Sequence, residues 1–182
     1  IFFIQIGHLA NELTTLTKIL IYANAETEIQ ILKRAYITQT SIIARICIGK
    51  AFEGWRLLQD YYFTSQLAKK YEAKLTPSGL ESLQKLKKYF SRKNHICELR
   101  NKFSFHNPSS QDIKYQLELM PDDADLDLYI GTQHANSNYY LSEEIISRAM
   151  LNYVESTSLQ QAMDTMYKEF IEVSGWFVEF CG

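Results

Sequence analysis

The sequence predicts a mainly α fold, an up-and-down bundle of about six helices in a single domain over residues 1–182. Apolar residues recur at helical spacing along most of the chain. Only 7 of the 182 residues are Gly and 3 are Pro, so tight turns are few and the helices should be long. Short connections between the helical stretches favour an up-and-down arrangement.

Residues 5–23 and 28–62 are expected to form the first two helices, because leucine and isoleucine follow helical spacing there. The middle of the second helix, residues 41–58, is apolar on most sides, which is typical of a buried central helix. Gly49 and Gly54 interrupt it. Each Gly costs about 1 kcal/mol relative to Ala inside a helix, which indicates close helix packing or a kink.

The later helices have start and stop signals. Thr76 and Pro77 predict an N-cap and a first helical position. Ser91 looks like the cap of the next helix, which should end near His106 because a proline two residues later disfavours the α conformation before it. Further helices are expected over residues 64–74, 143–155 and 156–180, and a small β-hairpin is expected near residues 126–141.

Composition argues against several classes of protein. A formal net charge of −2 gives no overall attraction to nucleic acid, so any RNA contact must come from a local patch. The 3 cysteines are far apart and form no CxxC pair, which argues against a disulfide framework or a zinc site and favours a reducing, cytoplasmic location. No apolar run approaches the ~18 residues of a membrane span, so no membrane association is expected. The sequence predicts no metal and no cofactor.

The most informative segment is Glu98-Leu-Arg-Asn-Lys-Phe-Ser-Phe-His-Asn-Pro108. It places Arg100, Asn101 and His106 within about two helical turns of one another. Histidine transfers protons near neutral pH, and arginine offers a fixed charge that binds phosphate oxygens in pairs. These residues therefore predict cleavage of a phosphodiester without a metal ion.

This segment resembles the Arg-(Asn/Asp/His)-four-to-six-residues-His motif of the HEPN superfamily (higher eukaryotes and prokaryotes nucleotide-binding), here Arg100, Asn101, four residues and His106. The acidic Glu98, the order of helices and residues 49–55 also resemble an uncharacterised bacterial HEPN-like branch. The resemblance implies a metal-independent endoribonuclease, in which the RNA 2′-OH attacks the phosphate at a composite site of a homodimer. It also implies a toxin–antitoxin or phage-defence (abortive-infection) context, with an antitoxin protein as a partner.

Arg100 and His106 lie about 120° apart on an ideal helix. They can meet if the helix unwinds before the proline, or if a second subunit contributes its own copy. The structural alternative is that Arg100 pairs with a buried carboxylate and His106 caps the helix end. Glu53 is the candidate carboxylate, since it occupies an apolar position on the stripe of the second helix. Glu98 is expected either to orient a histidine or arginine of the other subunit or to be solvated.

Lys102 belongs to a local basic patch that is suited to an RNA backbone or is simply a solvated helix face. His95 is expected to be a surface or cap residue. The other members of the basic patch that contains Lys102 are Lys85, Lys87, Lys88, Arg92 and Lys93.

The sequence leaves two other functions open, a non-catalytic HEPN-like module that binds a nucleotide or a partner, and a helical scaffold.

Overall fold

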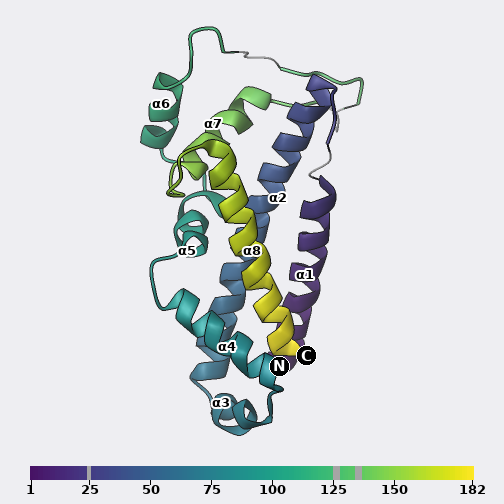
Figure 1. Cartoon of the computed structure of the whole chain (residues 1–182), viewed down its shortest axis with the longest axis vertical. Coiled ribbons are helices and arrows are strands. Elements are labelled where there is room, and N and C mark those ends of the chain that lie inside the picture. The colour runs from purple at the N-terminus through teal and green to yellow at the C-terminus, as the bar shows by residue number, and fades with distance from the viewer. Residues whose placement is uncertain (24–25, 125–127, 134–136) are drawn as a thin grey trace.

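The computed structural model describes residues 1–23, 26–124, 128–133 and 137–182, and most of them are helical (Figure 1). The predicted mainly α fold is confirmed, but the described residues contain eight α-helices rather than six. The helices are α1 (Phe2–Ala23), α2 (Gln30–Leu57), α3 (Gln66–Tyr71), α4 (Pro77–Phe90), α5 (His95–Leu99), α6 (Ser110–Glu118), α7 (Tyr140–Leu151) and α8 (Leu159–Cys181).

Three long helices, α1, α2 and α8, form the body of the molecule. In Figure 1, α1 leads away from the N-terminus, while α2 and α8 run back towards it, so both termini lie at one end. Helix α4 packs on α8 near that end, and α5 and α7 pack on α2. None of the described helices is long and apolar enough to cross a lipid bilayer.

The core lies where α1, α2, α4 and α8 meet. Gly54 allows α2 to approach both neighbours, since a Cβ placed there would lie 2.6 Å from Leu9 Cδ2 and 2.9 Å from Phe177 Cζ. The expectation of close packing at this glycine is confirmed. The largest side chains that are fully buried are Leu13, Ile48, Leu58, Tyr62, Leu83, Leu86, Leu99, Met150, Phe170, Val173 and Phe177.

Several helix boundaries follow the local signals. Thr76 Oγ1 accepts a hydrogen bond from the Gly79 N–H at 3.1 Å, and Pro77 opens α4 as predicted. Helix α2 stops earlier than expected, because the backbone widens into a π-helical segment over Leu58–Phe63. These differences shift the ends of helices and leave their order unchanged.

The segment between α5 and α7 differs from the prediction. In the described part of the expected hairpin, Tyr129 and Asn138 form an isolated antiparallel bridge, and no strand forms there. Residues 126, 127 and 134–136 of that hairpin lie outside the described residues. The sequence reasoning also missed α6, although Ser109 caps it by accepting the Asp112 N–H at 3.1 Å.

Candidate functional site

The Arg-Asn-x4-His motif lies where α5 widens into a π-helical turn. Helix α5 begins at His95 and is capped by Asn94, whose Oδ1 accepts the Cys97 N–H at 2.8 Å, and not by Ser91, which caps the C-terminal end of α4. The π-helical turn covers Arg100–Ser104, and the chain then leaves the helix. His106 therefore lies on the loop before α6, two residues beyond the end of the helix.

Arg100 turns towards α2. Its Nη1 donates to Asn101 Oδ1 at 3.2 Å, its Nη2 lies 3.5 Å from Glu53 Oε1, and its guanidinium lies 4.7 Å from the centre of the Phe52 ring. The pairing with Glu53 is present, but that side chain is 51% exposed, so the contact is a weak surface ion pair and not a buried one. Arg100 Nε is buried and has no hydrogen-bond partner among the described residues.

An open cavity of about 600 Å³ lies on the other side of the motif, and we call it the motif cavity. Asn101, Lys102 and His106 line it together with Asp112 and Tyr153. The exposed His106 side chain forms no hydrogen bond or ion pair within the described part of the chain. One chain thus brings three of the predicted residues to one cavity, and it leaves Arg100 outside.

Lys102 is a fixed cation in the motif cavity. Its Nζ donates to Tyr153 Oη at 3.2 Å, and Tyr153 Oη donates to Asp112 Oδ1 at 2.8 Å. The hydrogen bond to Tyr153 raises the pKa of Lys102. The hydrogen bond from Ser109 is the main cause that lowers the pKa of Asp112. Both groups are therefore charged at neutral pH, and the network holds the ammonium group beside the His106 loop.

Phe105 links the motif to α2. A Cβ at Gly49 would lie 2.4 Å from Phe105 Cε2, so this glycine makes room for the ring. Ile42 and Ile46 lie on the same stripe of α2 and are exposed, as is most of Phe105. We call Ile42, Ile46 and Phe105 the α2 patch. The ring of the residue that precedes His106 therefore lies against α2.

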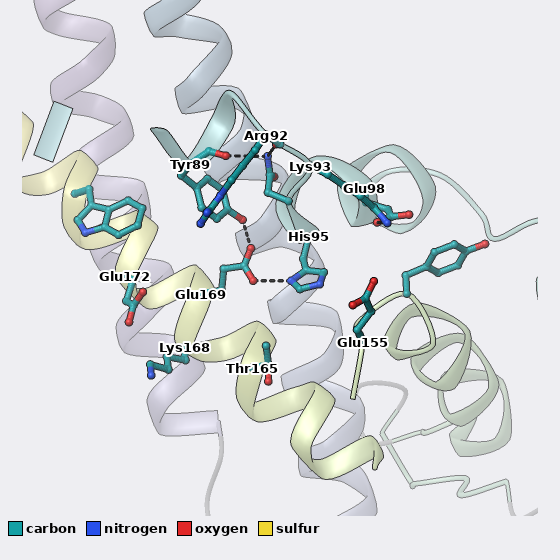
Figure 2. Close-up of a pocket in the computed structure, with 13 residues that line it drawn as sticks. Tyr89, Arg92, Lys93, His95, Glu98, Glu155, Thr165, Lys168, Glu169 and Glu172 are labelled. Carbon is teal, nitrogen blue, oxygen red and sulfur yellow. Dashed lines mark hydrogen bonds and ion pairs between the residues drawn. The ribbon is translucent and has the colours of Figure 1, made fainter. Parts of the chain in front are cut away.

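A second cavity, of about 630 Å³, lies between α5 and α8 (Figure 2), and we call it the His95 cavity. Glu169 lies at its centre. Its Oε1 accepts from Tyr89 Oη, and its Oε2 lies 2.6 Å from His95 Nδ1. Contrary to expectation, His95 is thus held half-buried against α8. Residues 74 positions apart carry no spacing signal, so sequence reasoning missed this pair.

The pKa values of this pair move in opposite directions. The hydrogen bond with Glu169 raises the pKa of His95 against the effect of burial, and the charges of Glu169, Glu98 and Glu155 add to the rise. Burial favours the neutral form of Glu169, but the hydrogen bonds from His95 and Tyr89 outweigh it and lower the pKa of the carboxyl group. Both shifts favour the charged form of each group, so the hydrogen bond has the character of an ion pair.

Stability should therefore depend on pH through His95. Its raised folded-state pKa gives a contribution that is complete below the usual 6.5 and is lost as the pH rises through the raised value. The lowered pKa of Glu169 gives a contribution that is complete above 4.5 and is lost on acidification. We expect His95→Gln to lower the free energy of unfolding by roughly 1–2 kcal/mol at pH 5.5 and by less at pH 8.5.

Urea denaturation of wild type and His95→Gln at both pH values measures this difference. His8→Gln is the matched control, because its side chain is 70% exposed and its 3.7 Å contact with Glu12 is a surface ion pair that contributes little. An equal cost of His95→Gln at both pH values would show that the charge on the imidazole does not stabilise the fold.

The two cavities adjoin, because Tyr153 lines both of them. Glu98 lines the His95 cavity with its Oε2 buried and 3.7 Å from Lys93 Nζ, so it is not the fully solvated carboxylate, and its expected role towards a second subunit stays a prediction. The residues of the predicted basic patch lie in different surroundings. Lys85 and Lys87 pair with glutamates, Arg92 and Lys93 line the His95 cavity, and Lys102 lines the motif cavity.

No family model matches the chain, and no curated protein and no solved structure is significantly similar to it. The resemblance to the HEPN superfamily therefore stays a prediction from the sequence, based on the motif, Glu98, the order of helices and residues 49–55. Within the described residues, no group of three or more His, Cys, Asp or Glu side chains is placed to hold a metal ion.

Proposed function

We propose that the chain is a metal-independent endoribonuclease of the HEPN type that acts as a homodimer. The observation that carries the proposal is the motif cavity, in which His106, Asn101 and Lys102 meet at one open surface. An imidazole that has no partner among the described residues, an amide and an ammonium group are suited to bind and cleave a phosphodiester. The cellular context we propose is cytoplasmic, in toxin–antitoxin or phage-defence biology, with an antitoxin that covers this cavity.

In the proposed reaction, His106 removes the proton from the RNA 2′-OH, and the freed oxygen attacks the adjacent phosphorus. The bond from phosphorus to the 5′-oxygen breaks, that oxygen takes a proton from water, and His106 releases to the solvent the proton that it gained. The products are a 2′,3′-cyclic phosphate and a 5′-hydroxyl. Lys102 and Asn101 contact the phosphate oxygens and stabilise the charge that develops there.

The α2 patch is the surface through which we expect two copies to pair. Exposed apolar side chains that form a contiguous patch mark interaction sites, and a two-fold dimer uses the same patch on both subunits. The stripe of α2 continues from Ile46 through Gly49 to Glu53, and Glu53 contacts Arg100. The ring of Phe105, the residue before His106, lies against Gly49 on the same stripe. Pairing across this patch would therefore bring Arg100 of each subunit towards His106 of the other.

RNA cleavage in excess EDTA tests the proposal. We expect wild type to release fragments with 2′,3′-cyclic phosphate ends, and His106→Ala to be slower by at least about a hundredfold. His8→Ala, which alters an exposed histidine on α1, is the control and should cleave like wild type. Failure of wild type to cleave a broad range of RNAs, or undiminished cleavage by His106→Ala, would refute the proposal.

The contact between Arg100 and Glu53 favours a second candidate function, a non-catalytic module that binds a nucleotide or a protein partner. It partly neutralises the arginine within one chain. In such a module Lys102 and His106 would bind a phosphate without breaking a bond. His106→Ala would then weaken binding, and wild type would have no cleavage activity to lose.

A further inference from the structure

The side chain of Lys102 is held by one neighbour in the motif cavity and keeps donors for a ligand. Its Nζ donates to Tyr153 Oη at 3.2 Å and lies 4.3 Å from the centre of the Tyr153 ring. Among the described residues it forms no ion pair and no second hydrogen bond. Because an ammonium group carries three N–H donors, two of them are left for a molecule bound in the cavity.

Tyr153 is itself fixed from two sides. Its ring lies 5.7 Å from the ring of the buried Phe103, centre to centre, and its Oη donates to Asp112 Oδ1 at 2.8 Å. Ser109 donates to the other oxygen of the Asp112 carboxylate at 2.6 Å, so both oxygens of this anion are engaged. The network joins the π-helical turn, α6 and the turn after α7, and it gives the ammonium group of Lys102 a defined position, which a proton transfer requires.

His106 and Lys102 lie at different edges of the motif cavity. Tyr153, which holds Lys102, also lines the His95 cavity, and His106 does not. His106 instead also lines a third cavity, of about 290 Å³, to which neither Lys102 nor Tyr153 contributes. In an in-line displacement the attacking and leaving oxygens lie on opposite sides of phosphorus, so the base and the acid have to lie apart. A phosphate between the two edges meets both conditions, with its 2′ side at His106 and its 5′ side at Lys102.

We propose that Lys102 is the general acid of the RNase and gives the leaving 5′-oxygen its proton in place of water. As the bond from phosphorus to the 5′-oxygen breaks, a proton passes from Lys102 Nζ to that oxygen, while His106 holds the proton taken from the 2′-OH. Transfer of this proton through the solvent from His106 to the neutral amine restores both groups. Tyr153 and Asp112 are positioning residues, because they act on the substrate only through Lys102. The inference rests on the proposed function and adds a second proton-transfer group to the same cavity.

The test compares RNA with an identical strand in which sulfur replaces the bridging 5′-oxygen, under single-turnover conditions in excess EDTA. A thiol has a pKa of about 8.5, so a thiolate is a weak base and leaves without a proton from an acid. Lys102→Arg is the decisive variant, because arginine keeps the positive charge but does not release its proton. We expect it to cleave normal RNA at least about a hundredfold more slowly than wild type, and sulfur-substituted RNA within about threefold of the wild-type rate.

Asn101→Ala is the matched control, since it removes a phosphate contact from the same cavity and should slow the cleavage of both substrates by the same factor. Tyr153→Phe tests the positioning, because it keeps the ring beside Lys102 and removes only the hydroxyl group. It should slow the cleavage of normal RNA by about tenfold and leave that of sulfur-substituted RNA nearly unchanged. Both substrates meet the same protein sample, so the ratio of the two rates does not depend on how much of a variant is folded.

Two results would overturn the inference and leave the proposed RNase activity standing. One is that Lys102→Arg slows the cleavage of both substrates equally, which would make the lysine a phosphate contact alone. The other is that Lys102→Arg cleaves normal RNA at the wild-type rate, which would mean that no proton comes from this residue. Failure of wild type to cleave either substrate would instead refute the RNase activity, and the inference with it.

Discussion

Mixing the Arg100→Ala and His106→Ala proteins is expected to restore RNA cleavage, although each variant alone is slower by at least about a hundredfold. In one chain, Arg100 lies against α2, while His106 lines the motif cavity. A site that takes its arginine from one subunit and its histidine from the other is complete once in each mixed dimer. With free exchange of subunits, we expect the mixture to reach about a quarter of the wild-type rate.

Mixing either single variant with the Arg100→Ala/His106→Ala double variant is the control, because no dimer in that mixture contains a complete site. Exchange of subunits is measured separately, by native mass spectrometry of chains that carry different tags. Free exchange without recovery of cleavage would place Arg100 and His106 of the working site in the same chain, and it would contradict the composite site.

Valine at the two glycines of α2 is expected to give opposite phenotypes. At Gly54, the new side chain meets Leu9 and Phe177, which are both buried, and overpacking there should lower the free energy of unfolding by about 3 kcal/mol. At Gly49, it meets the ring of Phe105, which is 59% exposed and can swing into solvent. The free energy of unfolding should then change by less than about 1 kcal/mol.

Gly49→Val should nevertheless reduce RNA cleavage by about tenfold to a hundredfold, because displacement of Phe105 moves the neighbouring His106 out of position. Urea denaturation and cleavage in EDTA, run on both variants and on wild type, separate the two effects. If Gly49→Val cleaves RNA at the wild-type rate, Phe105 does not position the imidazole. If it unfolds as easily as Gly54→Val, the ring is fixed more firmly than its exposure indicates.

The parts of the fold that could be predicted are those that depend on neighbouring residues. The Thr76 cap and Pro77 predict the start of α4 because both act within one turn. The same local reasoning failed where contacts between residues far apart in the sequence determine the structure. Apolar residues near Tyr129 predicted a hairpin, and within the described residues they form a single bridge to Asn138. Helix α6 was not predicted, although the Ser109 cap is a local signal.

The candidate site also has a part that could be predicted from the sequence and a part that could not. The motif could be found because Arg100, Asn101 and His106 lie within seven consecutive residues, although their grouping could not be foreseen. On an ideal helix, the side chains of Arg100 and His106 would point in different directions. In the structure, the π-helical turn and the loop after it decide which of the two side chains reaches the motif cavity. Glu53 was correctly selected as a partner of Arg100, but its exposure depends on what packs around α2.

By itself, the sequence determined a mainly α chain and placed Arg100, Asn101 and His106 in one short segment, because helical periodicity, caps and motifs act over a few residues. Only the tertiary structure decided that His106 and Lys102 share a cavity, that Phe105 lies against Gly49, and that His95 pairs with Glu169. These contacts join segments that are far apart in the chain, and they form because buried polar groups need partners and close packing requires complementary shapes.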